Sequence, residues 1–346
     1  MRTRWIGALG AVAVLAACSA QPAAPSPTAS SAAPSGAGTP ATSSSAAGPS
    51  ATSPSAASPS ATPGPPSSSL STSVSPAPST GGPSAATSST RLADGGVLAT
   101  YDVGGRAMAL TCHGSGTPTV IVLPGLGSSG SSWDAVAIAT ATTYRTRVCA
   151  VDRPGLGHSD ARAPGAHPSV GDMAGEIASL LLAAHVPTPY VVVAHSYGGL
   201  VARALVAQHG SDVAGMVYVD ASTLGELQSP YFAGVDWSEG GITVDIPRSE
   251  AELAAAGDVG STPVVVLTQD ATGEFAAQWL PLQDGLAATS SDRLHVVVTD
   301  VGHVIQQVNP GIVEAAVGDV VVAVRRGAAL PTCAGSGLPA LGGRCR

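Results

Sequence analysis

The stretch that decides the fold is Val193-Ala194-His195-Ser196-Tyr197-Gly198-Gly199. A run of valines leads into it and predicts a buried strand, and the apolar segment from Gly199 to His209 predicts a helix behind it. A serine in such a turn projects from the edge of a sheet only if the residues two positions before and after it are small. Ala194 and Gly198 satisfy this condition. The simpler alternative is that Ser196 only caps the helix.

Strand and helix patterns alternate on both sides of this turn. Valine-rich or isoleucine-rich segments predict strands at 97–102, 106–112, 119–123, 147–152, 190–195, 215–220, 263–267 and 294–299. Helices are predicted at 132–140, 170–184, 199–209, 274–289 and 310–326. This alternation is typical of an α/β fold, with a mostly parallel sheet covered by helices on both faces.

The serine turn in this setting resembles the nucleophile elbow of the α/β-hydrolase fold family. The resemblance spans about Val97 to Arg326, with Ala194 where the commonest elbow has glycine. It implies an eight-stranded sheet and a small cap between strands six and seven, at about residues 222–262. It also implies a serine hydrolase that cleaves carboxylic ester or related acyl bonds. We expect no metal and no cofactor, because no motif for either is present.

The resemblance assigns a Ser–Asp–His triad in that chain order. Ser196 is the expected nucleophile, and His303, in the loop after the last strand, is the expected base. The acid is open between two residues. Asp270 occupies the commoner family position, whereas Asp220 occupies the position used by a subset, which includes some haloalkane dehalogenases. We favour Asp220, because it directly follows its strand, and keep Asp270 as the alternative.

Two backbone N–H groups are expected to form the oxyanion hole, those of Tyr197 and Leu126. Leu126 follows Pro124-Gly125, where family members often carry His-Gly. The motif Asp152-Arg153-Pro154-Gly155 also matches the family, and its arginine is expected to be structural. In the predicted cap, three aromatic residues suit either an apolar lid over an acyl pocket or, equally, a small core of the cap itself: Tyr231, Phe232 and Trp237.

The first 18 residues predict export. Arg2 and Arg4 precede an uncharged run too short to span a bilayer, and Leu15-Ala16-Ala17-Cys18 resembles the lipobox of bacterial lipoproteins. Cys18 would then carry lipid and anchor the exported protein to the outer face of the cytoplasmic membrane or cell surface. The alternative is an ordinary secretory signal. Residues 19–90, almost wholly Ser, Ala, Pro, Thr and Gly, predict a disordered tether.

The remaining sequence divides into a hydrolase domain at 91–328 and a C-terminal tail at 329–346. Cys333 and Cys345 close a short loop in the tail, and Cys112 and Cys149 fall on strands that neighbour each other in the resembled fold. These are the expected disulfides among the three pairings that four cysteines allow.

The net charge of −8, without a concentrated basic region, argues against a nucleic-acid partner. The expected partners are therefore a small-molecule or lipid ester substrate and the membrane that holds the anchor. Two alternatives stay open on the same fold: a non-catalytic, lipid-anchored cell-surface binding protein, and a cofactor-free haloperoxidase-like perhydrolase.

Overall fold

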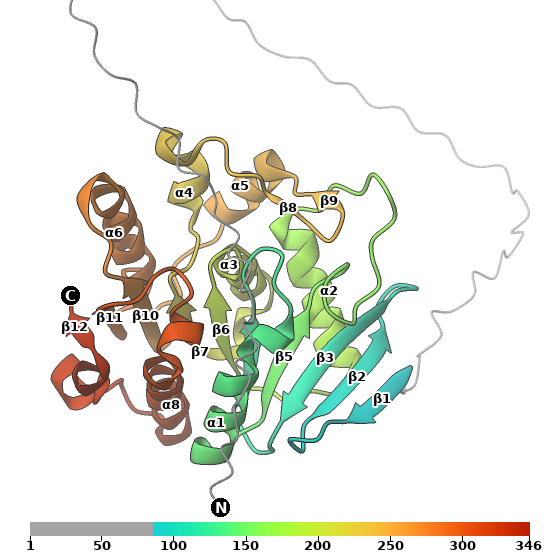
Figure 1. Cartoon of the computed structure of the whole chain (residues 1–346), viewed down its shortest axis with the longest axis horizontal. Coiled ribbons are helices and arrows are strands. Elements are labelled where there is room, and N and C mark those ends of the chain that lie inside the picture. The colour runs from blue at the N-terminus through green and yellow to red at the C-terminus, as the bar shows by residue number, and fades with distance from the viewer. Residues whose placement is uncertain (1–85) are drawn as a thin grey trace, which may run out of the picture. The chain divides into compact units, whose positions relative to one another are not determined.

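The structure of the chain, a computed structural model, describes residues 86–346. The predicted signal, Cys18 and nearly all of the predicted tether lie outside these residues. A ten-stranded sheet in the order β1-β2-β3-β5-β4-β6-β7-β10-β11-β12 runs through the described part (Figure 1). The strands are β1 (Ser88–Arg91), β2 (Val97–Asp102), β3 (Ala107–His113), β4 (Thr119–Leu123), β5 (Val148–Asp152), β6 (Tyr190–His195), β7 (Val213–Val219), β10 (Val264–Gln269), β11 (Arg293–Val298) and β12 (Gly343–Cys345).

The central strands run parallel to one another, in the order β5, β4, β6, β7, β10 and β11. At the two ends of the sheet, β1, β2, β3 and β12 pair antiparallel with their neighbours. The predicted fold class is therefore confirmed, but the predicted count of eight strands is wrong. The extra strands are the two edges, β1 and β12. Neither has a run of apolar residues, because an edge strand needs only backbone pairing on one side. β1 also begins at Ser88, inside the segment assigned to the tether.

Helices cover both faces of the sheet, as predicted. α1 (Asp134–Tyr144) and α8 (Pro310–Arg326) pack on one face, and α2 (Val170–Ala183) and α3 (Gly198–His209) pack on the other (Figure 1). α6 (Gly273–Ala287) joins the second layer through its C-terminal end. The sheet residues are buried on both sides, which explains why the central strands read as continuous apolar runs.

The cap lies between β7 and β10, where it was expected. It consists of α4 (Leu224–Gln228), the short antiparallel pair β8 (Ser238–Glu239) and β9 (Ile242–Thr243), and α5 (Ile246–Ala254). A last short helix, α7 (Ile305–Val308), precedes α8. In this part of the chain no helix is both long and apolar enough to cross a bilayer.

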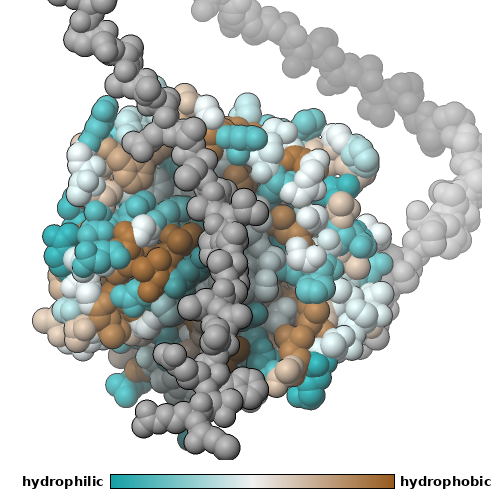
Figure 2. Space-filling model, in the orientation of Figure 1, coloured by the Kyte–Doolittle hydropathy of each residue, from teal (hydrophilic) through white to brown (hydrophobic). Residues whose placement is uncertain are grey.

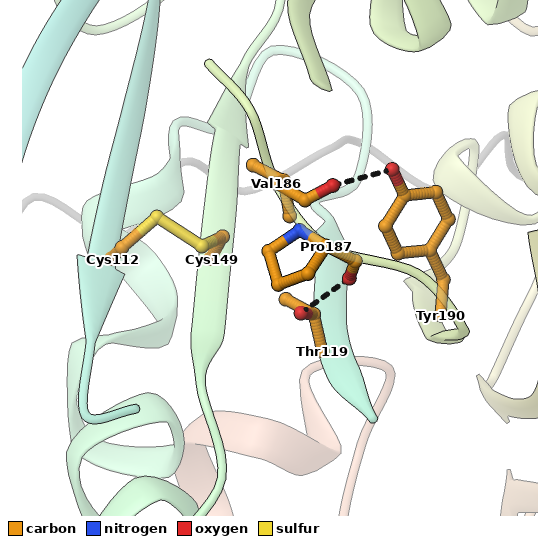
Figure 3. Close-up of a disulfide and its surroundings, with 6 residues drawn as sticks. All are labelled: Cys112, Thr119, Cys149, Val186, Pro187 and Tyr190. Carbon is orange, nitrogen blue, oxygen red and sulfur yellow. Dashed lines mark hydrogen bonds between the residues drawn. A yellow bond between two sulfur atoms is a disulfide. The ribbon is translucent and has the colours of Figure 1, made fainter. Parts of the chain in front are cut away.

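Two disulfides join the cysteine pairs expected from the sequence. Cys112 of β3 and Cys149 of β5 stand opposite each other in the antiparallel register and are bonded (Figure 3). The second disulfide joins Cys333 to Cys345 of β12, the strand that pairs with β11. Figure 3 also shows Thr119, which donates a hydrogen bond of 2.8 Å to the carbonyl of Pro187 and so fixes the connection that leads into β6.

Candidate active site

Ser196 occupies a strained turn between β6 and α3. Its φ of 51° lies in the left-handed region, which a non-glycine residue adopts only when its surroundings enforce it. The Ser196 N–H donates to the carbonyl of Val219 at 3.3 Å, and the N–H of Ser222 donates to the Ser196 carbonyl at 2.9 Å. At Gly198 a β-carbon would collide with the backbone carbonyl that ends β4. The small residues around the serine therefore allow three neighbouring strand ends to meet at the turn.

The structure brings Ser196, His303 and Asp220 into one hydrogen-bonded chain. His303 lies in the loop between β11 and α7, and its Nε2 is 2.8 Å from Ser196 Oγ. Its Nδ1 is 2.7 Å from Asp220 Oδ2. The His303 side chain is 45% exposed, whereas the Asp220 side chain is fully buried. The imidazole is thus open to solvent on one side and fixed by a buried carboxylate on the other.

Asp220 accepts further hydrogen bonds that hold its carboxylate in place. Oδ1 accepts from the backbone N–H of Gln269 at 3.0 Å and from Trp279 Nε1 at 2.8 Å. Oδ2 accepts from Gln269 Nε2 at 2.8 Å as well as from His303. Buried carboxylates need such donors, because an unpaired charge away from water is costly.

Asp270, the alternative acid, is placed differently. Its Oδ2 accepts a hydrogen bond of 3.0 Å from the backbone N–H of Asp300, and this contact is exposed. Of the two candidate carboxylates, only Asp220 is hydrogen-bonded to His303 in the described part of the chain. Asp270 orders the start of the loop that carries the histidine.

His195 contacts His303 through a hydrogen bond and through packing of the two rings. Its Nε2 is 2.9 Å from the carbonyl of His303, so this nitrogen must carry the proton. The two imidazole rings pack with centroids 4.7 Å apart. Burial, together with the nearby His303, lowers the pKa of His195 from 6.5 to about 4. His195 is therefore neutral near pH 7 and acts as a fixed donor to the histidine loop.

The residues expected to form the oxyanion hole lie beside Ser196. A β-carbon at Gly125 would be 2.7 Å from His195 Nδ1 and 3.2 Å from Ser196 Cβ, so the loop after β4 touches the serine turn directly. Leu126 continues this loop, and Tyr197 follows the serine. Within residues 86–346 the backbone N–H groups of Leu126 and Tyr197 donate to no other protein group. Both are available to a ligand oxygen.

The three cap aromatics divide between two places. Phe232 packs edge-on against Trp279 at 5.8 Å between ring centroids and also contacts Tyr231 at 5.0 Å. Trp237 instead packs against Tyr197 at 5.9 Å. Phe232 therefore lies against the tryptophan that binds Asp220, Tyr231 lies against Phe232, and Trp237 lies against the residue after the serine.

The surface near the histidine loop is partly apolar. Figure 2 shows an apolar area where α7 and the loop before it lie. Val304, next to His303, is 36% exposed, and Val308 is 56% exposed. Such exposed apolar side chains beside a reactive centre suit contact with an apolar ligand.

Several residues at the site were not identified from the sequence. Gln269 and Trp279 hold Asp220, and Glu239 of the cap reaches the loop after β4. A polar residue that contacts a segment distant in the sequence leaves no local sequence pattern. The one available signal was the motif around Arg153, because an arginine expected to be structural needs a carboxylate partner such as Glu239. Within the described residues, no cluster of three or more His, Cys, Asp or Glu side chains is arranged to hold a metal ion.

Comparison with known proteins agrees with this architecture. A family model described as the alpha/beta hydrolase fold matches residues 118–252. The chain is 28% identical over 235 residues to the uncharacterized protein YqjL of Bacillus subtilis, and the aligned region covers 64% of this chain and 90% of YqjL. It is 43% identical over 83 residues to an uncharacterized protein of Schizosaccharomyces pombe, which covers 24% of this chain and only 15% of that relative.

Solved structures with the same arrangement include Cfl2 from Burkholderia cenocepacia, with a TM-score of 0.52 and 17% identity over 66% of this chain and 97% of that one. A proposed lipase from Acinetobacter baumannii AYE has a TM-score of 0.51 and 16% identity over 68% of this chain and 93% of that one. At such identities the likeness is one of fold. The strand order, the position of the cap, the matched family model and these neighbours agree, and we conclude that this chain has the α/β-hydrolase fold.

Proposed function

We propose that this protein is a serine hydrolase that cleaves carboxylic ester or related acyl bonds through an acyl-enzyme on Ser196. The observation that carries the proposal is the chain of two hydrogen bonds, 2.8 Å from Ser196 Oγ to His303 Nε2 and 2.7 Å from His303 Nδ1 to Asp220 Oδ2. A serine hydroxyl is a weak nucleophile until an adjacent base can take its proton. The arrangement supplies that base and a carboxylate that orients it.

In the proposed reaction, Ser196 Oγ attacks the acyl carbon while its proton passes to His303 Nε2. Asp220 keeps the other proton of the ring on Nδ1 and stabilises the imidazolium that forms. The N–H groups of Leu126 and Tyr197 accommodate the negative oxygen of the tetrahedral intermediate. His303 then gives its proton to the leaving alcohol, and the acyl group stays on Ser196. A water molecule attacks this ester by the same steps and releases the acid.

The surroundings favour an ester with an apolar part, from a small molecule or a lipid. Phe232 of the cap lies between Tyr231 and Trp279, which binds the triad carboxylate, and Val304 is exposed beside the histidine. Apolar walls with few polar groups are typical of sites that bind acyl chains.

The test is labelling with a fluorophosphonate probe, together with hydrolysis of chromogenic esters of increasing acyl length. We expect wild type to be labelled and to turn over, and Ser196→Ala to lose both. Ser179→Ala is the matched control, because Ser179 lies on α2 and only bonds the carbonyl of Gly175. Labelling or full turnover by Ser196→Ala would rule out the proposal. A wild-type protein with neither labelling nor turnover would also rule it out, and would leave a binding protein on the same fold as the better explanation.

We also propose that the chain is exported and held at the membrane by lipid on Cys18. The supporting features are the Leu15-Ala16-Ala17-Cys18 motif and the two disulfides of the domain, which suit an oxidising compartment. Cells that express the full chain should incorporate labelled palmitate into wild type and not into Cys18→Ala. Equal incorporation by both chains would contradict lipidation at this residue.

A further inference from the structure

A buried ion pair lies behind the loop that carries Leu126. The side chains of Arg153 and Glu239 are 1% and 2% exposed. Arg153 Nε donates to Glu239 Oε1 at 2.7 Å, and Nη2 donates to Oε2 at 2.6 Å. Two charges removed from water in this way need hydrogen bonds that replace those of water, and the bidentate contact between guanidinium and carboxylate provides two of them.

The remaining hydrogen bonds of the pair go to the backbone around Leu126. Arg153 Nη1 donates to the carbonyl of Pro124 at 2.6 Å, and Nη2 donates to the carbonyl of Gly125 at 2.7 Å. Glu239 Oε2 accepts from the N–H of Gly127 at 3.1 Å. The ion pair thus holds this loop on both sides of Leu126.

The bond to Gly125 has a direct consequence for Leu126, because the Gly125 carbonyl and the Leu126 N–H belong to the same peptide unit. In a trans peptide these two groups point in opposite directions. A guanidinium that holds the oxygen therefore aims the N–H away from Arg153. The positive charge of the guanidinium, next to the carbonyl oxygen, also polarises the peptide and strengthens its N–H as a hydrogen-bond donor.

Arg153 also contacts the residue that supplies the second donor. Its Cζ lies 5.3 Å from the centre of the Tyr197 ring, within the range of a cation–π contact. Trp237, two residues before Glu239, packs against the same ring at 5.9 Å. Both peptide N–H groups of the proposed oxyanion hole are thus connected to this one buried pair.

Glu239 belongs to the cap, not to the sheet. It lies in β8, and the next residue, Gly240, packs so closely on the loop after β5 that a β-carbon at Gly155 would be 2.5 Å from the Gly240 carbonyl. The cap is therefore fixed to the domain at the point where its carboxylate meets Arg153.

We infer that Glu239 is a positioning residue for the oxyanion hole, which it orients through Arg153 and the Gly125–Leu126 peptide. The cap then has a part in the chemical step in addition to covering the site. This inference rests on the proposed function, since it needs an oxyanion at Leu126.

The first test is Glu239→Gln. The amide keeps the shape of the side chain but has one acceptor oxygen for three donors and no charge. Complete loss of one donor in such a hole lowers kcat by about 100-fold to 1000-fold, so we expect a fall of about 10-fold to 100-fold for a displaced donor, with KM nearly unchanged. Rates are expressed per active site, counted by fluorophosphonate labelling, so that unfolded protein does not contribute.

Glu176→Gln is the matched control. Glu176 accepts from Arg106 and Arg162 in another partly buried cluster that does not touch the loop, so kcat per site should equal that of wild type. A second variant, Arg153→Met with Glu239→Leu, replaces the pair by apolar groups. Such replacements of buried ion pairs often preserve stability, and we expect this variant to fold and still turn over slowly.

The inference is overturned if either Glu239→Gln or the double variant has the kcat per site of wild type, because the pair would then only stabilise the fold. A wild-type protein without labelling or turnover at Ser196 is a different result. It would overturn the proposed function, and this inference with it.

Discussion

The choice between the two candidate acids can be tested by Asp220→Asn. Asp220 Oδ1 accepts from two donors fixed in place, the Gln269 N–H and the Trp279 indole, so the amide oxygen of the asparagine should take this position. Its NH₂ group then replaces Oδ2 and faces His303 Nδ1 at a hydrogen-bonding distance. His303 must accept that hydrogen bond and carry its own proton on Nε2, where it can no longer take the proton of Ser196.

The size of the effect follows from this wrong tautomer. Loss of the orienting carboxylate with the geometry intact lowers kcat by about 1000-fold to 10,000-fold, which is about 4 to 5.5 kcal/mol of transition-state stabilisation. Asp270→Asn is the control. Because the Asp270 contact to Asp300 is exposed, a change there is expected to alter rates by no more than about 2-fold.

The assay is the initial rate on a chromogenic ester, divided by the concentration of folded protein measured from the thermal unfolding signal. KM should change little, since neither carboxylate contacts the acyl group in the proposed mechanism. The reasoning would be refuted by Asp220→Asn with a kcat close to wild type, or by a large loss of kcat in Asp270→Asn.

Three further outcomes are expected. Gly198→Ala should lower both the melting temperature and fluorophosphonate labelling, because its β-carbon meets a rigid backbone carbonyl, whereas Gly285→Ala on open α6 should keep activity and gain about 0.5 to 1 kcal/mol of stability. Because His195 has a folded pKa of about 4 against 6.5 unfolded, the unfolded chain binds its proton first, and as pH falls from 7 to 4 this group should remove about 3 kcal/mol of stability. Urea unfolding of His195→Gln should show a shallower loss over that range, and equal slopes would contradict the assignment. Replacement of Cys112 and Cys149 by alanine opens a loop of sequence separation 37 and should cost about 4 kcal/mol of unfolding free energy with kcat unchanged, so a changed kcat would link this bond to the site.

The central elements could be predicted because their signals are local. Val191–Val193 and the other apolar runs are buried on both faces of the sheet. A strand covered by helices on both sides has apolar residues at successive positions, which is a pattern visible in the sequence. The serine turn is recognisable because the residues on either side of Ser196 must be small. The edge strands β1 and β12 were missed because they bury little and rely on backbone pairing.

The sequence by itself determined the α/β class and the place of the cap, and it predicted the set of Ser196, His303 and two possible acids. Only the tertiary structure decided which acid meets His303, since Asp220 and Asp270 both directly follow strand ends, and which of them lies within hydrogen-bonding distance of His303 depends on packing. It also decided the contacts of Trp279 and Glu239. Glu239 lies 86 residues from Arg153 along the chain, and contacts at such separations arise from how the sheet and cap pack, which no local pattern of residues encodes.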